Sequence, residues 1–254
     1  MQVNISRRAL HAVPALLLGA ALVLGGCSPM PEIGEATTEE TYALGAAAAA
    51  RGDHLLAIEA MNRVLSQSPL HELADDALLA LAESHRAMSD FASAEAEYAR
   101  LSTDYPRSPL VPEASYRLGL AYRDQSLPPA LDQTMTERAI AQFEQFLAEH
   151  PDDPFVPDAK ERVAELRSRL AQKAYESARL YLTLKNGASA RVYFEAVVRD
   201  YPDTPWAPRA LLAEARSAVA DGLPDEARGA YERLMELYPG SEEASSAALE
   251  VSGP

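Results

Sequence analysis

The stretch Ala-Arg-Val-Tyr-Phe-Glu-Ala-Val-Val-Arg-Asp-Tyr-Pro, residues 190–202, carries the pattern that decides the fold. Its first alanine is followed after four residues by a phenylalanine, after seven by a valine and after twelve by a proline. Positions i, i+4 and i+7 lie on one face of an α-helix. A proline ends a helix because it lacks the backbone N–H and clashes with the preceding turn. The stretch therefore predicts a helix that buries one narrow face and stops before Pro202.

Four more stretches of the chain have the same frame. The alanines are Ala57, Ala94, Ala139, Ala190 and Ala227; the large residues after them are Met61, Tyr98, Phe143, Phe194 and Tyr231; the next apolar residues are Val64, Leu101, Phe146, Val197 and Leu234; and the prolines are Pro69, Pro106, Pro151, Pro202 and Pro239. A small residue lets two helices cross closely, and the large one fills the gap between neighbouring helix pairs. This is the frame of the second helix of a tetratricopeptide repeat. It predicts an all-α fold, an α-solenoid of about five tetratricopeptide-like helix pairs.

The repeat boundaries follow from the prolines. We expect a tetratricopeptide-repeat domain at 39–254, with repeats at about 39–70, 75–106, 112–151, 158–202 and 208–239 and then a short C-terminal helix. The first helices match the repeat pattern less well, the best match being Leu118-Gly119-x-x-Tyr122. Extra residues near Asp124 to Met135 predict an insertion, and the run from Asp158 to Leu184 predicts an extended first helix. Ser108, Asp153 and Thr204 are predicted helix caps.

The first residues predict export and lipidation. Arg7 and Arg8 precede the apolar run from Ala9 to Leu24, and Leu-Gly-Gly-Cys at 24–27 resembles the lipobox of bacterial lipoproteins. This resemblance implies a signal peptide at 1–26 and a lipidated flexible tether at 27–38. Cys27 would carry S-diacylglycerol and N-palmitoyl groups, and no other cofactor is expected. An uncleaved membrane anchor with an incidental cysteine is the alternative.

Composition and motifs favour a binding protein over an enzyme. The net charge of −15 would repel nucleic acid and favour partners with basic patches. No histidine pair has metal-binding helical spacing, and neither a phosphate-binding glycine loop nor a G-x-S-x-G motif occurs. We therefore expect no metal site and no catalytic residues.

First helices of such arrays line the concave side, where a peptide could lie. The matched frames place tyrosines and arginines there, the residue types enriched in binding hot spots. The predicted groove consists of Tyr42, Arg86, Tyr116, Arg123, Tyr175 and Arg179. In the alternative interpretation the tyrosine rings cover apolar neighbours and expose only their hydroxyl groups.

A lipobox, a short tether and five repeats with Tyr-Pro ends together resemble the BamD family, the lipoprotein subunit of the outer-membrane β-barrel assembly machine. The sharpest likeness runs from Arg169 to Thr204 and ends in Arg-Asp-Tyr-Pro-Asp-Thr, residues 199–204. Tyr193 departs from the family pattern, since it stands where an arginine is common.

The resemblance implies a non-catalytic scaffold in the outer membrane, lipid-anchored and facing the periplasm, as Ser28 after the cysteine also suggests. Its partners would be the periplasmic domains of a BamA-like subunit, unfolded outer-membrane proteins and other assembly-complex lipoproteins. The residues expected to dock the BamA-like partner are Arg191, Tyr193, Arg199 and Asp203. A Tol-associated division coordinator or a secretion or pilus accessory lipoprotein remains the alternative.

Overall fold

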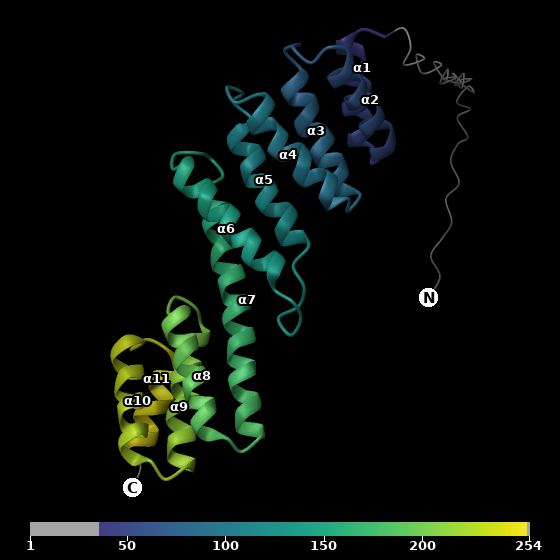
Figure 1. Ribbon diagram of the computed structural model, residues 1–254. Coiled ribbons are helices and arrows are strands. Elements are labelled where there is room, and N and C mark those ends of the chain that lie inside the picture. The colour runs from purple at the N-terminus through teal and green to yellow at the C-terminus, as the bar shows by residue number, and fades with distance from the viewer. Residues whose placement is uncertain (1–35, 253–254) are drawn as a thin grey trace, which may run out of the picture. The chain divides into compact units, whose positions relative to one another are not determined.

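A computed structural model describes residues 36–252, and every regular element among these residues is an α-helix (Figure 1). Cys27, the predicted signal peptide and most of the predicted tether lie outside the described residues. The helices are α1 (Thr38–Ala50), α2 (His54–Gln67), α3 (Ala74–Ala87), α4 (Phe91–Asp104), α5 (Val111–Asp124), α6 (Thr134–Glu149), α7 (Val156–Thr183), α8 (Gly187–Asp200), α9 (Trp206–Ala220), α10 (Pro224–Leu237) and α11 (Glu242–Ser252). Thr38, assigned to the tether by sequence, is the first residue of α1, which Thr37 caps.

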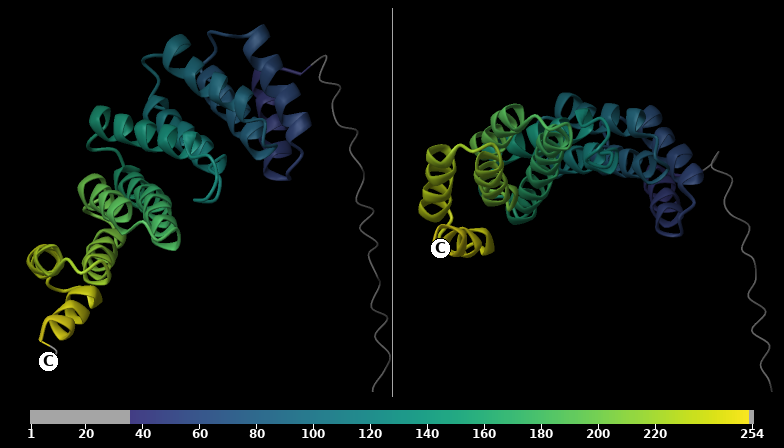
Figure 2. Two further views of the ribbon diagram at one scale, coloured as in Figure 1. Left: turned by 60° about the horizontal axis from the view of Figure 1, so that its bottom comes forward. Right: turned by 90° about the horizontal axis from the view of Figure 1, so that it is seen from below.

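The ten helices from α1 to α10 form five antiparallel pairs that follow one another in chain order (Figures 1 and 2). Each helix packs on the helix before and after it, and α7 also contacts α9 across the intervening α8. The short helix α11 packs on α10 and α9. The predicted all-α solenoid of about five helix pairs is thereby confirmed.

The alanine–aromatic frame forms the core of every pair. Its five alanines are at most 3% exposed, and its five large residues are at most 6% exposed. Phe143 and Phe194, for example, are fully buried. Burial of a large apolar side chain contributes about 1.5–3 kcal/mol relative to leaving it in water. The frame read from the sequence is therefore the buried face of the second helices.

Two glycines of the first helices allow the close crossing. A Cβ atom on Gly45 would stand 2.8 Å from the terminal methyl carbon of Met61, and one on Gly119 would stand 2.6 Å from the ring of Phe143. Both glycines therefore lie against the large residue of the frame in the partner helix. The Leu-Gly-x-x-Tyr element of α5 is explained by this contact.

The tyrosine before a repeat-ending proline ties two successive repeats together. The hydroxyl of Tyr105 donates to the carbonyl oxygen of Pro69 at 2.9 Å, and Tyr238 donates to Pro202 at 3.0 Å, both across 36 residues. The contact of Tyr201 is of another kind: its ring lies beside Arg167 of α7, whose guanidinium is 5.6 Å from the ring centroid. The Tyr-Pro phrase is thus a packing device in this array.

Four of the five turns within pairs share one backbone design. They span residues 51–53, 88–90, 184–186 and 221–223, and the middle residue of each has a positive φ: Gly52, Ser89, Lys185 and Gly222. The third residue of three of these turns caps the next helix, as Asn186 does by accepting from the backbone N–H of Ser189 at 3.0 Å.

The fifth turn, between α5 and α6, holds the predicted insertion and spans 125–133. The side-chain amide of Gln133, 5% exposed, donates to several backbone carbonyls of this turn, including that of Pro128 at 2.9 Å. Arg169 and Lys173 of α7 donate to the carbonyls of Leu127 and Leu131. The insertion is therefore an ordered loop fastened to α7.

The prediction that Ser108, Asp153 and Thr204 are helix caps is wrong. Helices α5, α7 and α9 begin at Val111, Val156 and Trp206, two or three residues after Ser108, Asp153 and Thr204. Ser108 and Asp153 instead accept hydrogen bonds from the backbone N–H two residues later, and Thr204 donates to the carbonyl of Tyr201. They stabilise the turn before each helix.

Candidate protein-binding surfaces

Arg86, a predicted groove residue on α3, belongs to a charge network within the protein. Its guanidinium donates to Glu83 at 3.1 Å and to Asp124 at 2.6 Å. Arg117 contacts the same Glu83 carboxylate at 2.8 Å, and the hydroxyl of Tyr98 also donates to it. Burial opposes ionisation of Glu83, but the bonds from Tyr98 and Arg86 and the charge of Arg117 hold its pKa below the usual value. Arg86 therefore uses its hydrogen bonds to join α3 and α5.

Tyr116, expected in the groove, is a core residue instead. It is 7% exposed, and its ring stacks on Phe155 with centroids 4.6 Å apart and an interplanar angle of 7°. Its hydroxyl donates to Asp158, and burial together with this carboxylate raises the pKa of Tyr116 to about 12. The physical reason is the third repeat's aromatic cluster, in which Phe143 and Phe146 also contact the tyrosine. A peptide in a groove could not reach this ring.

Three predicted groove residues keep part of their surface open on three helices. Tyr42 on α1 is half-buried, and burial together with the charges of Asp76 and Asp75 raises its pKa. Arg123 on α5 pairs with the adjacent Asp124 at 2.8 Å. Arg179 on α7 pairs with Glu176, and its side chain is 57% exposed. These contacts are local and leave the three side chains accessible in part.

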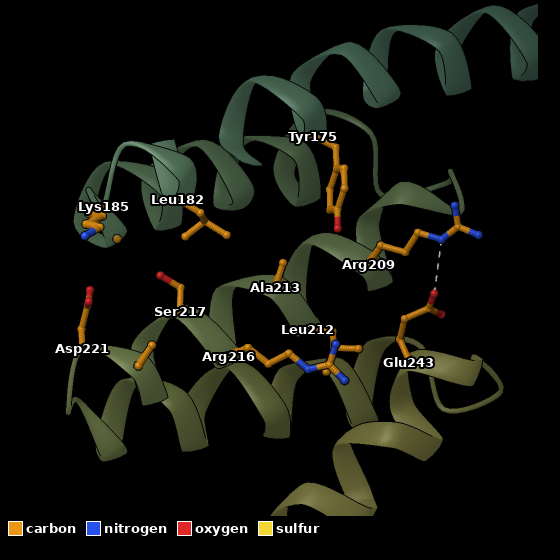
Figure 3. A pocket seen from close by; sticks show the side chains of 12 residues that line it. Tyr175, Leu182, Lys185, Arg209, Leu212, Ala213, Arg216, Ser217, Asp221 and Glu243 are labelled. Atoms are coloured by element: carbon orange, nitrogen blue, oxygen red, sulfur yellow. Dashed lines mark hydrogen bonds and ion pairs between the residues drawn. The ribbon is translucent and has the colours of Figure 1, made fainter. Parts of the chain in front are cut away.

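Tyr175, the remaining predicted groove residue, lines a cavity of about 690 Å³ between the C-terminal half of α7 and α9 (Figure 3). Its ring packs against Phe194 and Trp206, with centroids 5.4 Å and 5.2 Å away. Figure 3 shows its hydroxyl directed toward α9, where Leu212 and Ala213 form an apolar wall. A cavity of this volume is large enough to hold several side chains of a bound peptide.

Three cations that sequence reasoning missed border this cavity. Arg209 and Arg216 lie seven residues apart on α9, and Lys185 follows α7 (Figure 3). The sequence signal that could have predicted this face is the seven-residue spacing of Arg209 and Arg216, with Leu212 between them, because residues i and i+7 lie on one side of a helix. Arg209 contacts Glu243 of α11 at 3.3 Å.

Two of the predicted docking residues hold the protein's own helices. Arg191 on α8 is 14% exposed and contacts Asp221 at 2.5 Å and Glu226 at 3.1 Å. Asp203 pairs with Arg167 of α7 through both carboxylate oxygens, at 2.6 Å and 3.0 Å. The contacts of Arg191 join α8 to the turn before α10 and to the start of α10. The contact between Arg167 and Asp203 joins the turn at 201–205 to α7.

The other two docking residues, Tyr193 and Arg199, are exposed on α8. The ring of Tyr193 is 42% exposed and stacks on Tyr181 of α7 at 4.7 Å. Arg199 is 69% exposed, and within the described residues its guanidinium pairs only with the adjacent Asp200, at 2.8 Å and 2.9 Å. Leu180, Leu184 and Val192 lie within three residues of these tyrosines in the chain and are all more than half exposed, and Val192 also lines the second cavity described below. We call the set of Leu180, Tyr181, Leu184, Val192 and Tyr193 the α7–α8 surface.

A second cavity, of about 570 Å³, lies beside Arg191 and Arg199 and is lined from α8, α9 and α10. One oxygen of Glu214 is buried there without a hydrogen-bond partner. Burial and then the charge of Glu195 raise the pKa of Glu214 to about 7. Arg233 contacts the carboxylate of Glu195 at 2.8 Å, so it is directed to Glu195 and not to Glu214.

Neither a metal-binding group nor a membrane-spanning helix occurs in residues 36–252. No three histidine, cysteine, aspartate or glutamate side chains of this region are placed to hold a metal ion together. None of its helices combines the length and the apolar character needed to cross a bilayer.

Comparison with known proteins identifies the family. Residues 34–234 match the model of the family described as YfiO, outer membrane lipoprotein. The outer membrane protein assembly factor BamD of Caulobacter vibrioides is 27% identical over 237 residues, covering 89% of this chain and 77% of the relative. BamD of Vibrio cholerae is 26% identical over 87% of this chain and 95% of the relative. Among solved structures, the TPR2AB domain of yeast Sti1 aligns with a TM-score of 0.47 and 16% identity over 84% of each chain. The match to the family model covers most of the chain, and the chain therefore belongs to the YfiO family of outer membrane lipoproteins.

Proposed function

We propose that this chain is a non-catalytic scaffold lipoprotein of the outer-membrane β-barrel assembly machinery. The family match over residues 34–234 carries the proposal, and the relatives from Caulobacter vibrioides and Vibrio cholerae bear the name of outer membrane protein assembly factors. The fold supports it, because stacked helix pairs offer long surfaces for other proteins. The acidic chain, with its net charge of −15, suits basic partner surfaces and does not suit nucleic acid.

The α7–α8 surface, together with Arg199, is the proposed contact for the periplasmic domains of a BamA-like subunit. Tyrosine and arginine contribute strongly to protein interfaces when they become desolvated. Tyr193 is held in place by its stack on Tyr181, so little side-chain freedom is lost on binding. Arg199 forms an ion pair only with its neighbour Asp200 in the described residues and can be recruited. Arg191 and Asp203 would support this surface from within, without touching the partner.

Unfolded outer-membrane proteins and other assembly-complex lipoproteins are the further proposed partners. Of the predicted groove, Tyr42, Arg123, Tyr175 and Arg179 keep accessible surface for a peptide, whereas Arg86 and Tyr116 serve the fold. Lipidation of Cys27 would anchor the protein on the periplasmic face of the outer membrane. One diacylglycerol and one acyl chain exceed the two-chain requirement for stable anchoring.

Photo-crosslinking in cells tests the docking proposal. A crosslinking amino acid replaces Tyr193 in the full-length chain, and in the control it replaces Lys160, an exposed residue of α7. The expected result is a covalent adduct from position 193, identified by mass spectrometry as a barrel-forming subunit with periplasmic domains, and none from position 160. A second crosslinking variant replaces Arg199. If neither position 193 nor position 199 yields such an adduct in intact cells, the proposed docking surface is refuted.

Membrane fractionation tests the anchor separately. The full-length chain should sediment with outer membranes, and Cys27→Ala should release it or leave it unprocessed. Equal outer-membrane recovery of both would show that lipid on Cys27 is not the anchor.

A further inference from the structure

The cavity between α7 and α9 is lined by two hydroxyl groups that form no hydrogen bond within the described residues. The hydroxyl of Ser217 lies on its α9 wall, where the residue is 5% exposed and the oxygen has no hydrogen-bond partner (Figure 3). A buried hydroxyl without a partner is unfavourable, because it has lost water and gained nothing. The hydroxyl of Tyr175 also faces the cavity and forms no hydrogen bond within residues 36–252. Both hydroxyls can form hydrogen bonds with polar atoms of a ligand.

The cavity wall between these hydroxyls is apolar. Leu182 of α7 lies opposite Ala213 of α9, and Leu212 of α9 also lines the cavity (Figure 3). Leu182 is 37% exposed although it borders a concave surface. A ligand that fills the cavity therefore carries at least one apolar side chain.

Charge decides what else the ligand carries. Lys185, Arg209 and Arg216 border the cavity in a chain whose net charge is −15, and Lys185 has no ion pair within the described residues. Asp221 and Glu243 also line the cavity, but Asp221 pairs with Arg191 and Glu243 pairs with Arg209. Arg209 and Arg216 remain 48% and 55% exposed although Glu243 and Glu250 of α11 contact them. Each guanidinium has five N–H donors, and one carboxylate does not use them all. The contacts from α11 also show that carboxylates approach this edge.

We infer that the α7–α9 cavity is a binding site for an acidic linear segment of a partner protein, which inserts an apolar side chain beside Leu212 and places carboxylates on Lys185, Arg209 and Arg216. Backbone groups of the segment meet the hydroxyls of Ser217 and Tyr175. The site is separate from the α7–α8 surface, and the inference does not depend on the proposed function.

Selection from a library of short random linear peptides tests the inference without requiring that the partner be identified first. The target is the full-length chain, extracted from membranes in detergent. The expected result is enrichment of peptides that combine an apolar residue with aspartate or glutamate. Recovery of basic or uncharged peptides, or no enrichment, would overturn the inference.

Two variants then locate the binding of the enriched peptides, measured by fluorescence anisotropy. Ala213→Trp fills the cavity from its half-exposed wall and should weaken binding by about tenfold or more. Lys185→Glu reverses a charge that has no partner to lose and should weaken binding by about threefold or more. Arg228→Glu makes the same charge change at an exposed residue of α10 outside the cavity and should leave binding unchanged. Peptides that bind both cavity variants as tightly as the parent chain would place their site elsewhere and refute the inference.

Discussion

The backbone of Gly119 lies against the ring of Phe143, so closely that a Cβ atom at this position would stand 2.6 Å from a ring carbon. Phe143 is fully buried, and its ring also contacts Tyr116 at a centroid distance of 5.7 Å. The ring therefore cannot move aside without disturbing the aromatic cluster of the third repeat. Close packing makes such an interior intolerant of added volume.

Gly119→Ala should destabilise the protein. The added methyl group overpacks the α5–α6 crossing, a change that costs about 1–3 kcal/mol in well-packed cores. Gly229→Ala is the matched control, because Gly229 lies within α10 and a Cβ there meets nothing within 4 Å. In the control, better helix propensity should stabilise the protein by about 0.5–1 kcal/mol. Urea denaturation followed by circular dichroism measures both, and equal effects of the two substitutions would contradict the packing argument.

Glu214→Gln should stabilise the protein above neutral pH. Because the folded pKa of about 7 lies above the unfolded value of 4.5, the stability that goes with the protonated carboxyl is fully present below pH 4.5. This advantage is lost as the pH rises from about 4.5 through 7, since the unfolded chain ionises first. Gln cannot ionise, so its variant should gain on the order of 1–2 kcal/mol over the parent at pH 8. The gain should vanish near pH 4, as measured by urea denaturation at both values.

Much of the fold could be predicted from the sequence because the alanine–aromatic frame depends on local spacing alone. Ala94 and Tyr98 are four residues apart, and helical geometry puts them on one face whatever surrounds them. The long helix and the insertion were likewise visible, since both change the distance between repeat-ending prolines. The common turn design was missed, although Arg-Gly-Asp at 51–53 and Asp-Gly-Leu at 221–223 share it with Met-Ser-Asp at 88–90.

The predicted groove was less successful because helical spacing gives the face of a side chain and not its partners. Arg86 meets Asp124 across 38 residues, and no local pattern relates the two. Tyr116 was assigned to the concave side, but stacking on Phe155 of the next repeat buries it. The α7–α9 cavity was missed for the same reason, since α7 and α9 are separated in the chain by a whole helix.

Arg191→Ala and Arg199→Ala should separate support of the fold from contact with a partner. Arg191→Ala removes contacts to Asp221 and Glu226 and should cost about 1–2 kcal/mol of unfolding free energy, since both carboxylates can be hydrated afterwards. Arg199→Ala should change stability by less than about 0.5 kcal/mol, because the side chain is 69% exposed. Thermal denaturation measures the stability, and pull-down of the barrel-forming subunit measures the binding. Arg199→Ala should weaken binding more than Arg191→Ala does, and the reverse order would move the interface away from Arg199.

Lys173→Ala should loosen the inserted loop at residues 125–133 without unfolding the array. The ammonium of Lys173 donates to the carbonyl of Leu131 at 2.6 Å, and Arg169 reaches the carbonyl of Leu127 only at 3.5 Å. Loss of the shorter contact leaves the loop held mainly by its internal bonds to Gln133. Amide hydrogen exchange in the loop should therefore become faster, while exchange in α5 and α6 stays the same. Lys160→Ala, an equal change at an exposed site on the same helix, should leave loop exchange unaltered. Unchanged exchange in Lys173→Ala would mean that Gln133 and Arg169 keep the loop ordered without Lys173.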